Sequence, residues 1–387
     1  MMEVIELPYI KDYLEWRGDL SFSKDDINDV DILALSLVPL LDLDGLAPTI
    51  DSNESISLHD LFTKYLEPKY NKSIHLGLII SDEYTKSIIS YKDHNRYKHL
   101  KLSDYFNEIS SEESMQCCGC TIEIRKDLHL ICCSGTDDTI IGWKENLLMM
   151  YNSITNGEIR IHKYIESIID KYEGNFIVAG HSKGGIFSEV GTALLDDERF
   201  NRVTKVLAFD SPGIQDLSYY DEKVLNRIKE MTLYIPDTSI VGRSFNHIEK
   251  QIVVKSTNNG LYQHDPFSWK VLGREFVTVA KCSKMSDDMS ELINKVVRNM
   301  SIDERKNFVS TITNLFTDNN INRLLEVDSN KLAILRSFNS LNRQDKRFLT
   351  KILIQLERNS AFRKIIFYFI IDNNKEQRKQ KLKVKQK

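Results

Sequence analysis

A short glycine–serine pattern is the clearest sign of chemistry in this chain of 387 residues: positions 180–184 read Gly-His-Ser-Lys-Gly. An apolar, strand-like run at 175–179 precedes the pattern, and a helical segment begins near Gly185. In a G-x-S-x-G pattern placed between a strand and a helix, the serine sits on a sharp turn that small flanking residues permit. We therefore predict Ser182 as a nucleophile. The N–H of Lys183, at the positive end of the following helix, is a predicted donor to an oxyanion.

A serine nucleophile needs a histidine to take its proton, and a carboxylate normally orients that histidine. Only His247 and His264 follow Ser182 in the chain. His264 stands in a segment that Gly260 and Pro266 mark as a loop, and loops commonly carry catalytic residues. His264 is therefore the predicted general base.

The choice of acid is open between two aspartates that each follow an apolar strand. Asp237 follows the strand predicted at 231–235 and is the first choice, because site residues gather at the carboxyl ends of parallel strands. Asp210 follows the strand at 206–209 and is the alternative. Asp265 is less suited, since a residue adjacent to His264 does not easily reach around to its ring.

The elements that must position these residues alternate between short apolar runs and helical patterns from about 123 to 267. This alternation is typical of βαβ units, so we predict an α/β fold with a mainly parallel central sheet. The predicted strands are 128–133, 175–179, 206–209 and 231–235, with a final pair near 251–254 and 275–279. Helical spacing of apolar residues at 161–172 predicts a crossover helix that leads into the second strand.

Several further motifs, spread from about residue 13 to residue 276, carry a family resemblance. They are Trp16-Arg17-Gly18-Asp19, Gly135-Thr136-Asp137-Asp138, Gly142-Trp143-Lys144-Glu145, Phe209-Asp210-Ser211-Pro212-Gly213, Ser239-Ile240-Val241-Gly242 and the run Gln263-His264-Asp265-Pro266-Phe267-Ser268-Trp269. With residues 180–184, the motifs at 135–137 and 209–213 resemble the class 3, fungal-type lipases. The whole set is more closely similar to a bacterial family of lipase-like α/β-hydrolases, largely known as a domain of unknown function.

The resemblance implies an α/β-hydrolase fold and a serine esterase or lipase-type activity. Carried over by position, Ser182 is the nucleophile, His264 the base and Asp237 the acid. Thr136 stands where such lipases place an oxyanion-hole residue, and it would act together with Lys183. Ser134 departs from the pattern, because the family often has arginine before the Gly-Thr pair.

The domain organisation follows from a change of composition near residue 282. Residues 1–281 are the predicted lipase-like domain with its N-terminal extension. Proline and glycine then disappear, which predicts a helical C-terminal region at 282–374. The tail at 375–387 has seven basic residues and one acidic residue. We expect a solvated, disordered end, with peripheral contact to anionic membrane lipid as the alternative.

Composition argues against several other classes of protein. The net charge of −4 gives no strong attraction to nucleic acid. The six cysteines include two adjacent pairs, which favour buried thiols in a reducing, cytoplasmic setting over a disulfide framework or a zinc site. The longest apolar run, 365–371, is far shorter than the roughly 20 residues of a membrane-spanning helix. The N-terminus lacks a stretch typical of a signal peptide, and no cofactor or metal is predicted.

These observations predict a serine hydrolase that cleaves carboxylic esters through an acyl-enzyme on Ser182. The expected substrate is a small-molecule ester or a lipid; phospholipid, thioester and amide substrates stay open, as does the oligomeric state. The alternative is a catalytically inactive, hydrolase-like binding module that acts through its helical C-terminal region.

Overall fold

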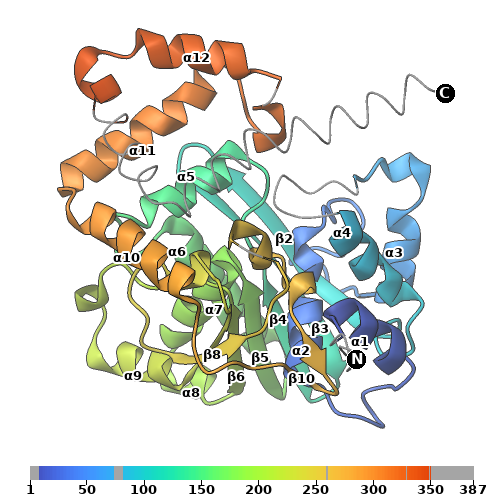
Figure 1. Ribbon diagram of the computed structural model, residues 1–387. Helices are drawn as coiled ribbons and strands as arrows, with labels where there is room; N and C mark the ends of the chain where they lie inside the picture. The colour runs from blue at the N-terminus through green and yellow to red at the C-terminus, as the bar shows by residue number, and fades with distance from the viewer. Residues whose placement is uncertain (1–7, 74–81, 259, 328, 348, 350–387) are drawn as a thin grey trace, which may run out of the picture.

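An eight-stranded sheet forms the centre of the molecule, and its strands lie in sequence order (Figure 1). The computed structural model describes residues 8–73, 82–258, 260–327, 329–347 and 349. The strands are β1 (Ile56–Ser57), β2 (Lys101–Ser110), β3 (Met115–Arg125), β4 (Leu128–Cys133), β5 (Asn175–His181), β6 (Val203–Phe209), β7 (Thr232–Pro236) and β8 (Lys250–Val254). Strands β1 to β4 pair antiparallel, and β4 to β8 pair parallel. The predicted α/β fold with a mainly parallel sheet is confirmed.

The strand pair expected near residues 251–254 and 275–279 forms only in part. Strand β8 is present, but β10 (Glu275–Phe276) pairs with β9 (Val271–Leu272) in a small separate sheet. A single bridge joins Val254 to Thr278. His264 lies between β8 and β9, as predicted, within the short 3-10 helix η6 (Gly260–His264).

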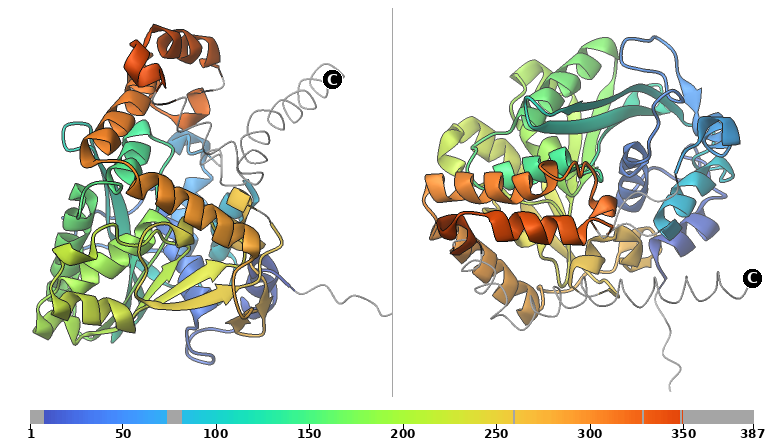
Figure 2. Two further views of the ribbon diagram at one scale, coloured as in Figure 1. Left: turned by 60° about the vertical axis from the view of Figure 1, so that its left-hand side comes forward. Right: turned by 90° about the horizontal axis from the view of Figure 1, so that it is seen from above.

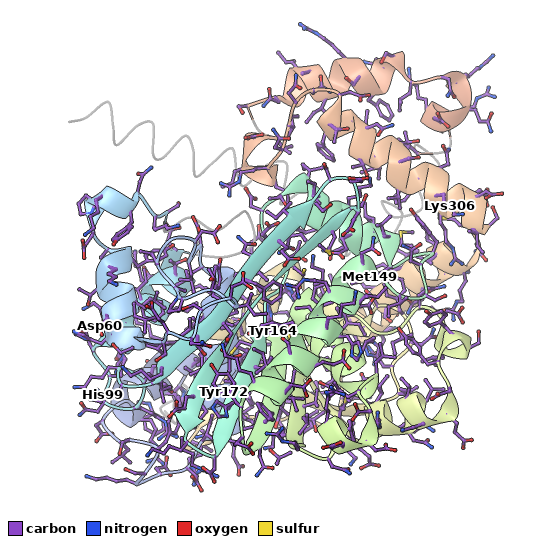
Figure 3. The ribbon with its side chains drawn as sticks, turned by 180° about the vertical axis from the view of Figure 1, so that it is seen from behind. Asp60, His99, Met149, Tyr164, Tyr172 and Lys306 are labelled. Carbon is purple, nitrogen blue, oxygen red and sulfur yellow. The ribbon has the colours of Figure 1, made fainter. Side chains whose placement is uncertain are left out.

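Side chains of the parallel strands alternate between two cores, one on each face of the sheet. On β5, Phe176 and Val178 point into one core, while Ile177 and Ala179 point into the other. Helices α6 (Asn156–Lys171), α7 (Lys183–Ala193) and α9 (Glu222–Glu230) cover the first face, and α2 (Asp29–Ser36) covers the second. Figure 3 shows α6 from behind, with Tyr164 and Tyr172 toward the long antiparallel strands. Their hydroxyls donate to the carbonyl and the carboxylate of Asp104 on β2.

Helix α6 begins five residues before the predicted start because a capping box forms at its N-terminus. The Thr155 N–H donates to the Glu158 carboxylate at 2.6 Å, and the Glu158 N–H donates to the Thr155 hydroxyl at 3.3 Å. This reciprocal pair satisfies two N–H groups that a helix start otherwise leaves without partners.

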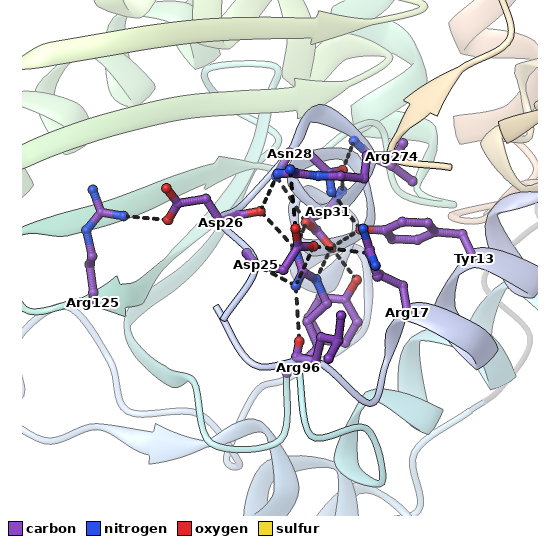
Figure 4. A network of polar contacts seen from close by, with 12 residues as sticks. Tyr13, Arg17, Asp25, Asp26, Asn28, Asp31, Arg96, Arg125 and Arg274 are labelled. Atoms are coloured by element: carbon purple, nitrogen blue, oxygen red, sulfur yellow. Dashed lines mark hydrogen bonds and ion pairs between the residues drawn. The ribbon is translucent and has the colours of Figure 1, made fainter. Parts of the chain in front are cut away.

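The N-terminal helices are held together by a buried ion pair between Arg96 and Asp31, both fully enclosed (Figure 4). The guanidinium donates to both oxygens of the Asp31 carboxylate, at 2.8 and 2.5 Å. The hydroxyls of Tyr13 and Tyr97 donate to the same carboxylate at 2.8 and 2.6 Å. Because α1 (Ile10–Arg17) carries Tyr13 and α2 carries Asp31, one carboxylate fixes the position of two helices.

Replacing Arg96 by methionine should destabilise the protein by about 3–5 kcal/mol, because it leaves the Asp31 carboxylate buried without its counter-charge. Thermal or urea unfolding followed by circular dichroism measures the loss. Arg125→Met is the matched control: Arg125 is half exposed and pairs with exposed Asp26 and Asp127, so its removal should cost less than about 1 kcal/mol. An equal loss of unfolding free energy in the two variants would show that the buried pair stabilises the fold no more than an exposed one.

The helices that follow the sheet gather beside α5 (Ile140–Leu148), at one end of the molecule (Figure 2). They are α10 (Lys284–Arg298), α11 (Ile302–Thr317) and α12 (Lys331–Ser340). Met150, Val297, Met300 and Val309 form a small core between α10, α11 and the end of α5, and α12 packs on α11. Helices are thus present where a helical C-terminal region was predicted, and its boundaries stay a prediction.

The part of the predicted region beyond 349, including the basic tail at 375–387 and its proposed membrane contact, lies outside the described residues. Within the part of the chain that the structure describes, no helix combines the length and apolar character needed to cross a membrane. All six cysteines are buried free thiols.

Candidate active site

Ser182 occupies a tight turn between β5 and α7, as the sequence predicted. Its backbone has φ 60° and ψ −131°, a conformation that costs a non-glycine residue of order 1–3 kcal/mol. The turn depends on glycine at two positions. A Cβ on Gly180 would lie 2.2 Å from the carbonyl oxygen of Gly184, and a Cβ on Gly184 would lie 2.1 Å from that of Cys133. Any side chain at either position would therefore force the turn open.

His264 and Asp210 form a hydrogen-bonded pair beside this turn. Nδ1 of His264 lies 2.6 Å from Oδ2 of Asp210. Because the carboxylate accepts the Nδ1 hydrogen, Nε2 of a neutral ring keeps its lone pair and can accept a proton. Neither Nε2 nor the Ser182 hydroxyl has a hydrogen-bond partner among the described residues, and both side chains line the same cavity.

The Asp210 carboxylate is almost fully buried, and donors from one short loop hold it in place. Its Oδ1 accepts a hydrogen bond from the Ser239 hydroxyl and another, at 3.0 Å, from the Gly242 N–H. A Cβ on Gly242 would lie 2.5 Å from this oxygen, so the loop approaches closely only because position 242 is glycine. The Ser239–Gly242 motif therefore leaves Oδ2 free to orient His264.

The expectation that Asp237 would contact His264 is wrong. Its Oδ2 accepts from Lys255 Nζ at 2.6 Å and its Oδ1 from the Ser256 N–H at 3.2 Å. The register explains the difference. The Ser182 N–H donates to the carbonyl of Phe209, the last residue of β6, so the next residue, Asp210, lies beside Ser182. Asp237 follows β7, which is one strand further from β5.

His181 supports the histidine loop from the position just before Ser182. Its Nε2 lies 2.8 Å from the carbonyl oxygen of His264, and the two rings are 4.4 Å apart. Burial, reinforced by His264, lowers the pKa of His181 well below its usual value. The ring is therefore neutral at pH 7 and donates its Nε2 hydrogen to that carbonyl, which fixes the loop.

Thr136 lies across the turn from this histidine pair, just after β4. A Cβ on the preceding Gly135 would lie 3.3 Å from the Cβ of Ser182, so the two loops touch. The Thr136 hydroxyl accepts a hydrogen bond from the Asn146 amide at 2.9 Å. Among the residues that the structure places, the N–H groups of Thr136 and Lys183 have no hydrogen-bond partner, and Thr136 lines the same cavity as Ser182.

A cavity of about 510 Å³ opens in front of these groups. Most of the cavity wall is apolar, and its residues come from several separate parts of the chain. The apolar lining residues include Leu37, Leu40, Ile140, Trp143, Leu147, Val241, Ile312, Phe316 and Leu324. Trp143 lines the cavity from α5, whereas Met149 and Met150 pack in the core.

Among the described residues, no group of three or more histidine, cysteine, aspartate or glutamate side chains is arranged to hold a metal ion. Asp137 instead accepts from the N–H of Thr139 at 2.9 Å and from its hydroxyl at 2.5 Å, as a turn residue does. Asp138 accepts hydrogen bonds from the segment that follows α11.

Sequence reasoning missed four residues of this site: His181, Asn146, Ser239 and Gly242. Ser239 and Gly242 lie in a motif that carried the family resemblance, and this membership was the signal that could have placed them near the site. His181 lies inside the glycine–serine pattern, but its partner, the carbonyl of His264, is 83 positions away. Asn146 is ten positions from Thr136, and no local pattern marks that contact.

Three solved lipases resemble the chain at low identity. M37 lipase is 15% identical, with 37% of this chain and 58% of that chain covered and a TM-score of 0.27. Lip2 lipase from Yarrowia lipolytica is 12% identical, with 55% and 85% covered and a TM-score of 0.32. The Rhizomucor miehei lipase propeptide complex is 11% identical, with 50% and 63% covered and a TM-score of 0.31. The chain thus spans less than two thirds of the first and third.

A search of curated proteins found no match. A family model described as Mbeg1-like matches residues 91–316, which include the turn at Ser182, Asp210, His264 and most of α11. This match extends over more than half of the sequence, and the chain belongs to the Mbeg1-like family.

Proposed function

We propose that the protein is a serine hydrolase that cleaves carboxylic esters. The observation that carries this proposal is the Asp210–His264 hydrogen bond, because His264 lines the same cavity as the strained Ser182 turn. A carboxylate on Nδ1, a free Nε2 and an unpartnered serine hydroxyl are the parts that an activated serine requires. Asp210 takes the place of Asp237 as the acid of the proposed triad.

In the proposed reaction, the Ser182 hydroxyl attacks the ester carbonyl while Nε2 of His264 takes its proton. Asp210 stabilises the resulting imidazolium, and the N–H groups of Lys183 and Thr136 stabilise the oxyanion. The imidazolium then protonates the leaving alcohol. Water, deprotonated by His264, cleaves the acyl-enzyme and regenerates the Ser182 hydroxyl.

The cavity supports an ester with an apolar acyl group. Apolar side chains from the loop after α2, from α5 and from α11 surround the space next to Ser182. Transfer of an acyl chain from water to such a wall contributes about 0.8 kcal/mol per methylene group. A lipid ester is accordingly the substrate that we propose.

Fluorophosphonate labelling tests whether Ser182 is activated. Wild-type protein should be labelled and should hydrolyse p-nitrophenyl esters. Ser182→Ala should lose both properties, because no hydroxyl remains to form the covalent bond. Ser167→Ala, which removes a hydroxyl bonded within α6, is the control and should behave as wild type. A folded wild-type protein that is neither labelled nor active would favour the non-catalytic binding module instead.

Asp210→Asn and Asp237→Asn distinguish the two candidate acids. The asparagine oxygen at 210 can still accept from Ser239 and Gly242, but its NH2 group then faces Nδ1 and favours the wrong imidazole tautomer. We expect kcat to fall about 10⁴-fold for Asp210→Asn. For Asp237→Asn it should stay within about threefold, since Asp237 contacts Lys255 and Ser256. The reverse order of effects would exclude Asp210 as the acid.

Substitution of Ile312 by tryptophan tests whether α11 forms the acyl wall. Added volume in the cavity should raise KM for long-chain p-nitrophenyl esters at least tenfold and leave short-chain esters nearly unchanged. Asn314→Trp places the same side chain on the exposed face of α11 and is the matched control. Equal effects of Ile312→Trp on all chain lengths would show that the acyl group lies elsewhere.

A further inference from the structure

A second buried charge pair lies directly beside the Ser182 turn, outside the proposed triad. The side chain of Lys183 is 1% exposed, and its partner Glu145 on α5 is fully enclosed. Nζ of Lys183 donates to Glu145 Oε2 at 2.8 Å and to the carbonyl and side-chain oxygens of Gln116, each at 2.7 Å. Three acceptors thus satisfy the three hydrogens of the ammonium group.

The pair joins the Ser182 turn to the loop that carries Thr136. The side-chain oxygen of Gln116 that accepts from Lys183 also accepts from the Asp137 N–H, at 3.4 Å. Glu145 additionally accepts from the Gln116 N–H at 3.0 Å. The residue after Glu145 is Asn146, whose amide bonds to the Thr136 hydroxyl. One network therefore connects the two loops that face a ligand oxygen.

Two glycines make room for this network. A Cβ on Gly142 would lie 3.0 Å from the side-chain oxygen of Gln116 and 2.7 Å from Asp137 Oδ1. A Cβ on Gly157 would lie 2.4 Å from Glu145 Oε1, which accepts the Gly157 N–H at 2.9 Å. Backbone and side chains therefore surround the charges closely and leave little freedom to shift.

A gain in the stability of the folded protein does not by itself explain a buried pair of this kind. Desolvation of two buried charges offsets most of their attraction, and apolar replacement of a whole buried pair is often neutral. Three directed hydrogen bonds from one ammonium group do, however, fix the positions of the elements that carry the acceptors. These elements are β3 and α5.

We propose that Lys183, Glu145 and Gln116 are positioning residues that hold the two oxyanion donors, the N–H groups of Lys183 and Thr136, at a fixed separation. The inference rests on the proposed ester hydrolysis. The two donors come from separate loops, after β5 and after β4, and covalent geometry does not fix their spacing. A displacement of about 1 Å at such a site can cost about 10²-fold in rate.

The double variant Lys183→Met/Glu145→Gln tests the proposal. It removes both charges together, so no buried charge is left without its partner, and the glutamine oxygen can still accept the Gly157 N–H. We expect kcat for a p-nitrophenyl ester to fall about 10²-fold while KM changes less than threefold. Affinity for a trifluoromethyl ketone, which binds as an oxyanion adduct, should fall by the same factor as kcat/KM.

Lys171→Met/Asp104→Asn is the matched control, because it removes a lysine–aspartate pair that joins the end of α6 to β2, three strands away from β5. Its kcat should stay within threefold of wild type. Counting active sites by fluorophosphonate labelling separates a loss of folded protein from a loss of rate per site. A purely structural role would lower the number of labelled sites and leave kcat per site unchanged.

Gln116→Met gives a second test should the double variant not fold. It removes the shared side-chain acceptor but keeps the Lys183–Glu145 pair and the Gln116 carbonyl. Its kcat per labelled site should fall about tenfold. If either the double variant or Gln116→Met folds and keeps the wild-type kcat per labelled site, the positioning role is overturned. A wild-type protein without labelling or turnover overturns the proposed function itself, and with it this inference.

Discussion

The close approach of backbone atoms at the Ser182 turn is the constraint on which the site depends. The start of α7 lies against the end of β4, and the carbonyl of Cys133 occupies the space that a side chain at Gly184 would need. The neighbouring strand adds a further contact, since the Ser182 N–H bonds to the carbonyl of Phe209. The ends of β4, β5 and β6 thus meet at one edge of the sheet, and the residues that follow each strand become neighbours.

Convergence alone does not orient side chains, and hydrogen bonds within a buried setting supply the rest. Asp210 uses one oxygen for donors from the loop after β7 and the other for His264. His181 holds the carbonyl of His264 from the opposite side. A carboxylate and an imidazole fixed in this way are preorganised, so little reorganisation is needed when charge develops on the ring.

The sequence could predict the parts of this arrangement that depend on neighbouring residues, but not the parts that depend on contacts between residues far apart in the chain. The strand before Ser182 and the helix after it have local signatures, and the structure has both elements there. The segment around His264 also has local turn signals, but it forms a short 3-10 helix where a loop was predicted. The choice between Asp210 and Asp237 depended on which strand lies next to β5. Both aspartates follow apolar strands, so only the order and register of β6 and β7 distinguish them.

The buried charges were the hardest to predict for the same reason. Lys183 is an ordinary polar residue in its local context, and its partners Gln116 and Glu145 are 67 and 38 positions away in sequence. The antiparallel part of the sheet was missed as well. Its long strand β2 mixes polar with apolar residues and shifts register between Ser103 and Phe106, so the two-residue alternation that predicts a strand is broken.

The C-terminal helices belong to the cavity as much as the sheet does. The Leu324 N–H donates to the carbonyl of Asp138 at 2.9 Å, and the Ile140 N–H donates to the carbonyl of Asn322 at 2.8 Å. The segment after α11 is therefore joined by backbone hydrogen bonds to the loop that follows Thr136, and Phe316 lines the cavity from α11 itself. The boundary predicted near residue 282 separates two regions of different amino-acid composition, but residues from both regions line the cavity. Any motion of these helices relative to the sheet would change the volume available next to Ser182, so their packing on α5 helps to set what the site can admit.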